Sequence, residues 1–148
     1  MTEPAISGSC LCGLVRFEVE PPFQIMAHCH CSRCRKSTGT GHATNLTAGP
    51  DQLRWLSGED AIGRYELPTA QSYGKWFCST CGSPVPRLRR DGRLYIVPAG
   101  SLDADPGVRP SHRIFWSSRA PWSCGAEALP THDAYPEVWT TQLAPQKR

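Results

Sequence analysis

The chain of 148 residues lacks any apolar run close to the roughly 20 residues that a membrane-spanning helix needs. Its first ten residues, MTEPAISGSC, include an acidic side chain and lack the apolar segment of a secretory signal peptide. A strong charge imbalance is also missing, because 16 Lys+Arg and 13 Asp+Glu leave a net charge of +3 without a long basic run. We therefore expect a soluble cytoplasmic protein with no membrane partner and no strong affinity for nucleic acid.

Long helices are not expected, because 14 prolines and 13 glycines interrupt the chain at short intervals. Between them lie short segments in which apolar and polar side chains alternate, as in LVRFEVE at 14–20, and this alternation predicts strands. SRCRKST at 32–38, followed by Gly39, predicts a helix, and RRDGR at 89–93 predicts a hairpin turn. Further segments are predicted as strands at 42–47, 52–58, 62–67, 74–78 and 93–102, as a helical turn at 126–129, and as either strand or helix at 136–141.

The length suits one domain over residues 1–148, with its core at about 8–125. The segments together predict a mostly β fold of small sheets with one or two short helices.

Eight cysteines carry most of the functional information. In a reducing compartment they favour metal binding, and a secreted domain held by disulfides is the alternative. They form a pair with one intervening residue, a triplet, a second pair with two intervening residues, and a single cysteine: Cys10 and Cys12; Cys29, Cys31 and Cys34; Cys78 and Cys81; and Cys124.

The two pairs predict one closed metal site. Cys78-x2-Cys81 followed by Gly82 is typical of a zinc knuckle, which supplies two ligands and needs two more. Cys10 and Cys12 can supply them, because alternation along a strand points both side chains the same way. Four thiolates around zinc form a structural site, and a redox-active Cys78–Cys81 pair is the alternative.

The triplet predicts a different kind of site. Alternation along the chain places Cys29 and Cys31 on one face and His28 and His30 on the other, and Cys34 returns from the first turn of the helix. Three protein ligands with an open fourth position are typical of catalytic zinc. Two alternatives remain open: a histidine (His28, His30 or His42) that completes a second structural site, or an iron–sulfur cluster.

Residues near these sites have candidate roles. The basic side chains of Arg33, Arg35 and Lys36 could hold a substrate carboxylate, or form a solvated helix face. His112 is a candidate general base, although a surface position is favoured. Trp116 and Trp122 are expected in the core rather than in a pocket wall, and Cys124 is expected to be a small buried residue rather than a reactive thiol.

Four segments in this order, GSCLCGLVRFEV, HCHCSRCRKSTG, FCSTCGSPV and HRIFWSSRAPW, resemble the glutathione-dependent formaldehyde-activating enzyme family, whose zinc-binding domain also occurs in centromere protein V. The resemblance implies a Mss4-like tent of small antiparallel sheets held together by zinc. It also implies two zinc sites: a structural one at Cys10, Cys12, Cys78 and Cys81, and a functional one at Cys29, Cys31 and Cys34.

The resemblance further implies a carbon–sulfur lyase reaction, the condensation of formaldehyde with glutathione to S-hydroxymethylglutathione, with Cys29, Cys31 and Cys34 as catalytic residues. Our hypothesis is that a substrate thiol enters the open position of the triplet and attacks the aldehyde as a thiolate. A zinc-stabilised binding module without catalysis is the first alternative, and a labile redox or metal-handling site is the second. A homodimer remains open.

Overall fold

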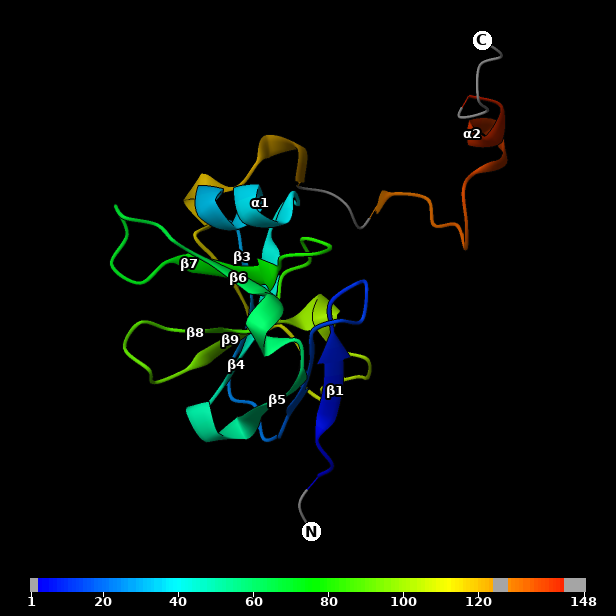
Figure 1. Cartoon of the computed structure of the whole chain (residues 1–148). Helices are drawn as coiled ribbons and strands as arrows, with labels where there is room; N and C mark the ends of the chain where they lie inside the picture. The colour runs from blue at the N-terminus through cyan, green and yellow to red at the C-terminus, as the bar shows by residue number, and fades with distance from the viewer. Residues whose placement is uncertain (1–2, 124–127, 143–148) are drawn as a thin grey trace.

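The computed structural model describes residues 3–123 and 128–142. Three small sheets form the framework of this part of the chain (Figure 1). The first has the order β1 (Ile6–Ser9), β2 (Arg16–Val19), β5 (Leu53–Ser57). The second has the order β10 (His112–Ile114), β3 (Met26–Cys29), β4 (Ala43–Ala48), β9 (Tyr95–Pro98), β8 (Arg87–Leu88). The third pairs β6 (Ile62–Glu66) with β7 (Gly74–Cys78).

The helices are few and short. The described residues include the α-helices α1 (Ser32–Thr38) and α2 (Glu137–Gln142). They also include the 3-10 turns η1 (Pro50–Gln52), η2 (Glu59–Ala61), η3 (Ala99–Ser101), η4 (Trp116–Ser118) and η5 (Pro121–Ser123). The predicted mostly β fold of small sheets with short helices is therefore confirmed.

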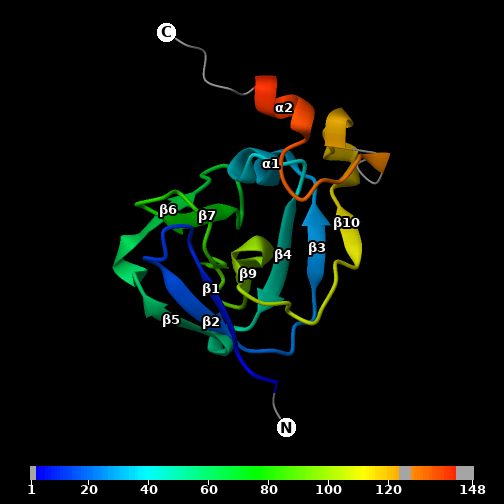
Figure 2. The ribbon, with the colours of Figure 1, turned by 90° about the vertical axis from the view of Figure 1, so that its right-hand side faces the viewer.

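One strand pair departs from the predicted antiparallel arrangement. β10 runs parallel to β3, with His112 opposite Ala27 and Ile114 opposite Cys29. The remaining pairs between the named strands are antiparallel. Figure 2 shows β10, β3 and β4 side by side, with α1 across the upper ends of β3 and β4. A parallel pairing requires a long connection, and here the chain between β3 and β10 contains most of the fold.

The core confirms the predicted alternation at 14–20. Val15, Phe17 and Val19 are fully buried, whereas Arg16 and Glu20 are exposed. Phe17 and Val19 pack with a cluster from β3, β4 and β9, and Val15 packs in a second cluster with two of the cysteines. β2 therefore joins the apolar core to the region of the first cysteine pair.

The helix α1 has the predicted bounds. Cys31 caps its N-terminus, and the Cys31 Sγ accepts a hydrogen bond from the backbone N–H of Cys34 at 3.3 Å. Gly39 ends the helix in the left-handed conformation with φ 70°, which glycine adopts without a steric penalty. Only Cys34 is buried within the helix. The helix caps thus fix the relative positions of two of the three triplet cysteines.

Other predicted bounds change. The segment predicted as a strand at 93–102 contains the shorter strand β9 followed by η3, and the predicted hairpin turn at 89–93 connects β8 to β9. The ambiguous segment 136–141 is helical, as α2. Of the predicted turn at 126–129, residues 126 and 127 lie outside the described residues, as does Cys124.

Candidate metal centres and the adjoining cavity

The first cysteine cluster joins two turns that are distant in sequence. The ligand atoms of its four cysteines, Cys10, Cys12, Cys78 and Cys81, all lie within 4.8 Å of one another. The Sγ atoms of Cys10 and Cys12 are 3.6 Å apart, and those of Cys12 and Cys78 are 3.9 Å apart. Cys10 and Cys78 are buried, whereas Cys12 is exposed. The structure thus brings together the four residues that the sequence predicts as one site.

The two turns are built alike. Cys10 and Cys12 lie in a turn after β1, not on a strand, and Gly13 follows with φ 77°. Cys78 ends β7, and Gly82 follows Cys81 with φ 74°. Each left-handed glycine returns its N–H to the carbonyl of the first cysteine of its turn, at 3.1 and 2.8 Å.

The first cluster is suited to a cation that prefers thiolates. The backbone N–H of Val15 donates to the Cys10 Sγ at 3.3 Å, which favours the thiolate form. The interaction with the Ser83 hydroxyl lowers the pKa of Cys81 to about 5. Four thiolates are a donor set that zinc prefers, and they close a tetrahedral shell.

The second cluster lies where β3 meets α1. The ligand atoms of Cys29, Cys31 and Cys34 lie within 4.8 Å of one another, and all three residues are buried. The hydrogen bond from the Cys34 thiol lowers the pKa of Cys29 to about 6, and the same interaction raises the pKa of Cys34. Three thiols that share protons at this distance form a donor set suited to one thiophilic cation.

The rings of the three nearby histidines lie close to one another. The rings of His28 and His42 lie 4.0 Å apart, and those of His30 and His42 lie 5.0 Å apart. His28 Nδ1 is also 2.8 Å from the Thr44 hydroxyl oxygen. Within residues 3–123 and 128–142, no histidine nitrogen joins the triplet as a fourth ligand atom. The alternative in which one of these histidines closes the shell therefore has no support in the geometry.

A cavity of about 370 Å³ adjoins the triplet, and Cys29 and Cys34 both line it. Its walls include apolar side chains from several strands and from the turn after β10, among them Trp76, Ile96 and Phe115. Phe115 has φ 55°, a left-handed conformation that is rare for a bulky residue. This conformation turns the chain from β10 into η4 at the edge of the cavity.

Tyr73 connects the cavity to the triplet. It packs against the three cysteines, lines the cavity, and places its hydroxyl 2.7 Å from the Ser37 Oγ of α1. Burial raises the pKa of Tyr73, so the phenol stays protonated at neutral pH. The guanidinium carbon of Arg33 lies 5.3 Å from the ring centre on the helix side.

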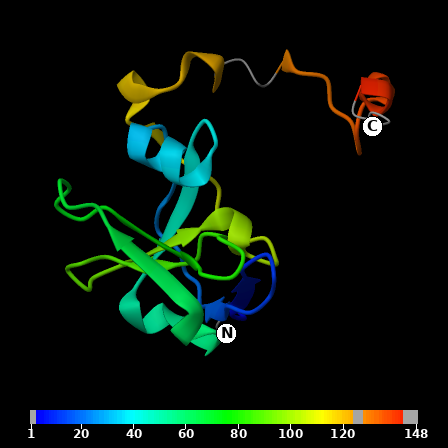
Figure 3. The ribbon, with the colours of Figure 1, turned by 45° about the horizontal axis from the view of Figure 1, so that its top comes forward.

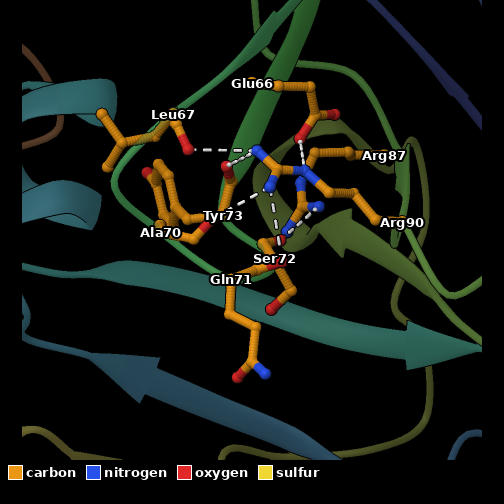
Figure 4. A network of polar contacts seen from close by, with 8 residues as sticks. All are labelled: Glu66, Leu67, Ala70, Gln71, Ser72, Tyr73, Arg87 and Arg90. Carbon is orange, nitrogen blue, oxygen red and sulfur yellow. Dashed lines mark hydrogen bonds and ion pairs between the residues drawn. The ribbon is translucent and has the colours of Figure 1, made fainter.

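Arg90 holds the loop 67–73 that carries Tyr73 (Figure 4). Its guanidinium pairs with Glu66 at 2.7 Å and donates to the carbonyl oxygens of Leu67 at 3.0 Å and Ala70 at 2.9 Å. Longer contacts reach two further carbonyl oxygens of the loop. One side chain thus binds several backbone acceptors of this irregular loop, in addition to the backbone hydrogen bonds that the Leu67 and Tyr73 carbonyl oxygens accept.

The cations of the cavity differ from those expected from the sequence. Lys75, Arg87 and Arg89 line it, whereas Arg33, Arg35 and Lys36 do not. The sequence did carry a signal for two of these residues, because Arg87 and Arg89 alternate before the hairpin turn and so share a side of the strand.

The tryptophans were expected in the core, and this expectation is wrong. Trp116 is 39% exposed and Trp122 is 71% exposed. Both lie in the 3-10 turns η4 and η5, which lie beside α1 (Figure 3), and not in strands. Trp116 stacks with guanidinium groups at 4.6 and 5.4 Å, and these contacts cover its faces without burying it. Neither tryptophan lines the cavity.

His112 is likewise on the surface. It is exposed on β10, its Nδ1 lies 2.7 Å from the Ser111 hydroxyl, and it does not line the cavity. The favoured surface position is therefore the one observed.

No helix in the described part of the chain has the length and apolarity needed to cross a bilayer.

The fold and its two cysteine clusters define a small β protein with one thiol cluster joining distant turns and another beside a cavity. Comparison with known proteins gives the family. The pattern of the family described as "Glutathione-dependent formaldehyde-activating enzyme" matches residues 5–118, and the chain belongs to this family.

Two relatives are consistent with this assignment. A Halomonas elongata protein named "Putative glutathione-dependent formaldehyde-activating enzyme" is 40% identical over 84 residues, which are 54% of this chain and 54% of that protein. The match thus spans about half the length of that curated relative. A crystal structure of a Rhodobacter sphaeroides protein aligns with a TM-score of 0.55 and 34% identity, over 70% of this chain and 91% of that one.

Proposed function

We propose that the protein is a cytoplasmic enzyme of the carbon–sulfur lyase type, which joins a small thiol to an aldehyde. By its family, the substrates are glutathione and formaldehyde and the product is S-hydroxymethylglutathione. The observation that carries the proposal is the position of the triplet, because Cys29 and Cys34 line a cavity of about 370 Å³. That volume lies within the roughly 300–1,000 Å³ of small-molecule sites.

Zinc is the metal that we propose for both clusters. The four-cysteine cluster would hold a closed structural ion, because its own four ligand atoms complete a tetrahedral shell. The three-cysteine cluster would hold a functional ion, with Cys29, Cys31 and Cys34 as ligands and the fourth position left to the substrate. When bound there, zinc would keep an incoming thiol in its thiolate form.

The chain itself supplies the place where the two substrates meet. The substrate sulfur would approach the triplet from the cavity side, where Tyr73 and apolar side chains form the wall. The thiol would release its proton to water as it becomes a thiolate. A sulfur lone pair would then form the C–S bond to the aldehyde carbon, the carbonyl π pair would move to oxygen, and that oxygen would take a proton from water, so that no net proton is gained or lost. Orientation of the two reactants within one cavity is the main contribution expected of the protein.

Cobalt substitution tests the metal part of the proposal. We expect two cobalt ions per chain, and glutathione should shift the optical bands of only one of them. In Cys34→Ser protein the thiol-sensitive bands should disappear and the other set should stay. Two sets of bands that ignore thiols would instead support the binding module.

A kinetic measurement tests the reaction. Condensation of 13C-formaldehyde with glutathione is followed by NMR exchange spectroscopy and compared with the uncatalysed rate. Cys31→Ser and Cys34→Ser should fall to the uncatalysed rate, and Arg93→Gln, at an exposed residue that does not line the cavity, should keep the wild-type rate. Full activity in the Cys31→Ser and Cys34→Ser proteins would refute the proposal.

A further inference from the structure

The charged side chains that line the cavity beside the triplet are all positive. Lys75, Arg87 and Arg89 line it, and no Asp or Glu is among its lining residues. Its remaining lining is largely apolar, so a charge inside the cavity is less screened than one on an open surface. Such a cavity favours an anionic ligand with an apolar or peptide-like body.

The three cations differ in their partners. Arg89 pairs with Asp91 at 3.2 Å, and the Lys75 ammonium donates to the backbone carbonyl of Ser37. Arg87 donates to the backbone carbonyl oxygen of Ser72 at 3.0 Å, and neither Lys75 nor Arg87 has a carboxylate within ion-pair distance in the described part of the chain. A guanidinium has five N–H donors, so most of its hydrogen-bonding capacity remains available.

The surrounding network keeps Arg87 without a carboxylate. Glu66 is the acidic group whose charge acts on Arg87, but it pairs with Arg90 at 2.7 Å (Figure 4). Burial lowers the pKa of Arg87, which indicates that its charge is not fully compensated by the protein. A half-buried guanidinium in this state gains from an anion that enters the cavity.

We propose that Arg87 is the specificity-determining residue of the cavity, and that it binds a carboxylate of the substrate thiol while the substrate sulfur reaches Cys29 and Cys34. This inference rests on the proposed function and adds to it the residue that would select the substrate thiol by its carboxylate. A planar guanidinium can hold a carboxylate through two parallel hydrogen bonds. Thiols without a carboxylate, such as cysteamine, would then be poor substrates.

The test measures binding without the reaction. S-methylglutathione keeps both carboxylates of glutathione but has no free thiol, so its binding depends on neither the aldehyde nor sulfur exchange at the triplet. Its dissociation constant is measured by calorimetry for the wild type, Arg87→Gln, Arg87→Lys and Arg93→Gln. Arg93 is the matched control, because it is exposed and does not line the cavity. Circular dichroism and metal content verify that each variant is folded and loaded as the wild type is.

The expected result is roughly a tenfold to hundredfold weaker binding in Arg87→Gln, the range of a charge-assisted hydrogen bond. Arg87→Lys should lie between it and the wild type, and Arg93→Gln should match the wild type. The dimethyl ester of S-methylglutathione should bind the wild type as weakly as the free acid binds Arg87→Gln.

Equal binding by the wild type and Arg87→Gln, or equal binding of acid and ester, would overturn the inference. An absence of measurable binding to the wild type would overturn it as well. Failure of the proposed function is a separate result, since it appears as missing condensation activity in protein that still binds S-methylglutathione through Arg87.

Discussion

Loss of one ligand from each cluster should affect stability unequally. In Cys78→Ser the four-cysteine cluster loses a fully buried ligand, and in Cys34→Ser the triplet loses its helix ligand. We expect the free energy of unfolding to fall more in Cys78→Ser, because only the four-cysteine cluster connects segments that are distant in sequence.

The separation of the linked residues gives the magnitude. Cys12 and Cys78 are 66 residues apart. Treated as a cross-link, a loop of that length restricts the unfolded chain by about 4 kcal/mol, whereas the span from Cys29 to Cys34 gives about 2 kcal/mol by the same relation. Cys78→Ser should therefore cost about 2 kcal/mol more than Cys34→Ser, a substantial part of the roughly 5–15 kcal/mol that stabilises a typical domain.

Urea unfolding in the presence of excess zinc, followed by circular dichroism, measures this difference, and metal analysis counts the ions retained by each variant. Both variants place a serine hydroxyl in a buried site, so that penalty largely cancels in the comparison. The reasoning is refuted if Cys34→Ser is destabilised as much as Cys78→Ser, or if Cys78→Ser unfolds with the wild-type midpoint.

Two further substitutions probe the backbone. Gly58→Ala should lower the free energy of unfolding by at least about 2 kcal/mol, since φ is 72° and a Cβ would lie 2.3 Å from a backbone carbonyl oxygen. Gly92→Ala, with φ 71° and open space around the Cβ, should cost only about 1 kcal/mol when both variants are compared by the same urea unfolding. Equal costs would contradict the clash. Arg90→Gln should speed amide hydrogen exchange in the loop 67–73 roughly tenfold or more, because the loop loses its hydrogen bonds to the Arg90 guanidinium. Exchange is measured by mass spectrometry with Arg93→Gln as control, and an unchanged rate would show that Arg90 does not hold the loop.

The bounds of helices and strands were predicted best where a glycine or a cysteine turn marks the end of the element. The bounds of α1 were predictable because Gly39 ends the helix, and those of β7 because Gly74 and the knuckle at Cys78 enclose an apolar segment. Alternation likewise predicted which side chains of β2 are buried. Each of these features is determined by residues that are close in sequence, so it can be inferred without knowledge of the tertiary structure.

Features that depend on distant residues were missed. The parallel pairing of β10 with β3 joins residues 112–114 to 27–29, and nothing in either short segment indicates the other. The exposure of Trp122 follows from its place in a 3-10 turn, whereas its apolar character indicated burial. The cavity was also unpredictable, because its wall combines β7, β8, the loop 67–73 and the turn after β10.

The same distinction explains why two clusters of cysteines can have different roles. In the four-cysteine cluster each turn contributes half of the ligand atoms, so neither turn can move away without opening the shell. In the triplet, β3 and α1 contribute all the ligand atoms within six consecutive residues, and the distant segments contribute the cavity instead. Because the triplet takes all its ligand atoms from one short segment, the side of the triplet that faces the cavity is lined by residues from distant segments. Here the fold brings Tyr73 on a loop fixed by Arg90, and it brings Arg87 without a carboxylate partner in the described residues. If the proposed function holds, an anionic thiol would find its sulfur site and its charge site in that one cavity, and this pairing would distinguish the triplet from a purely structural metal site.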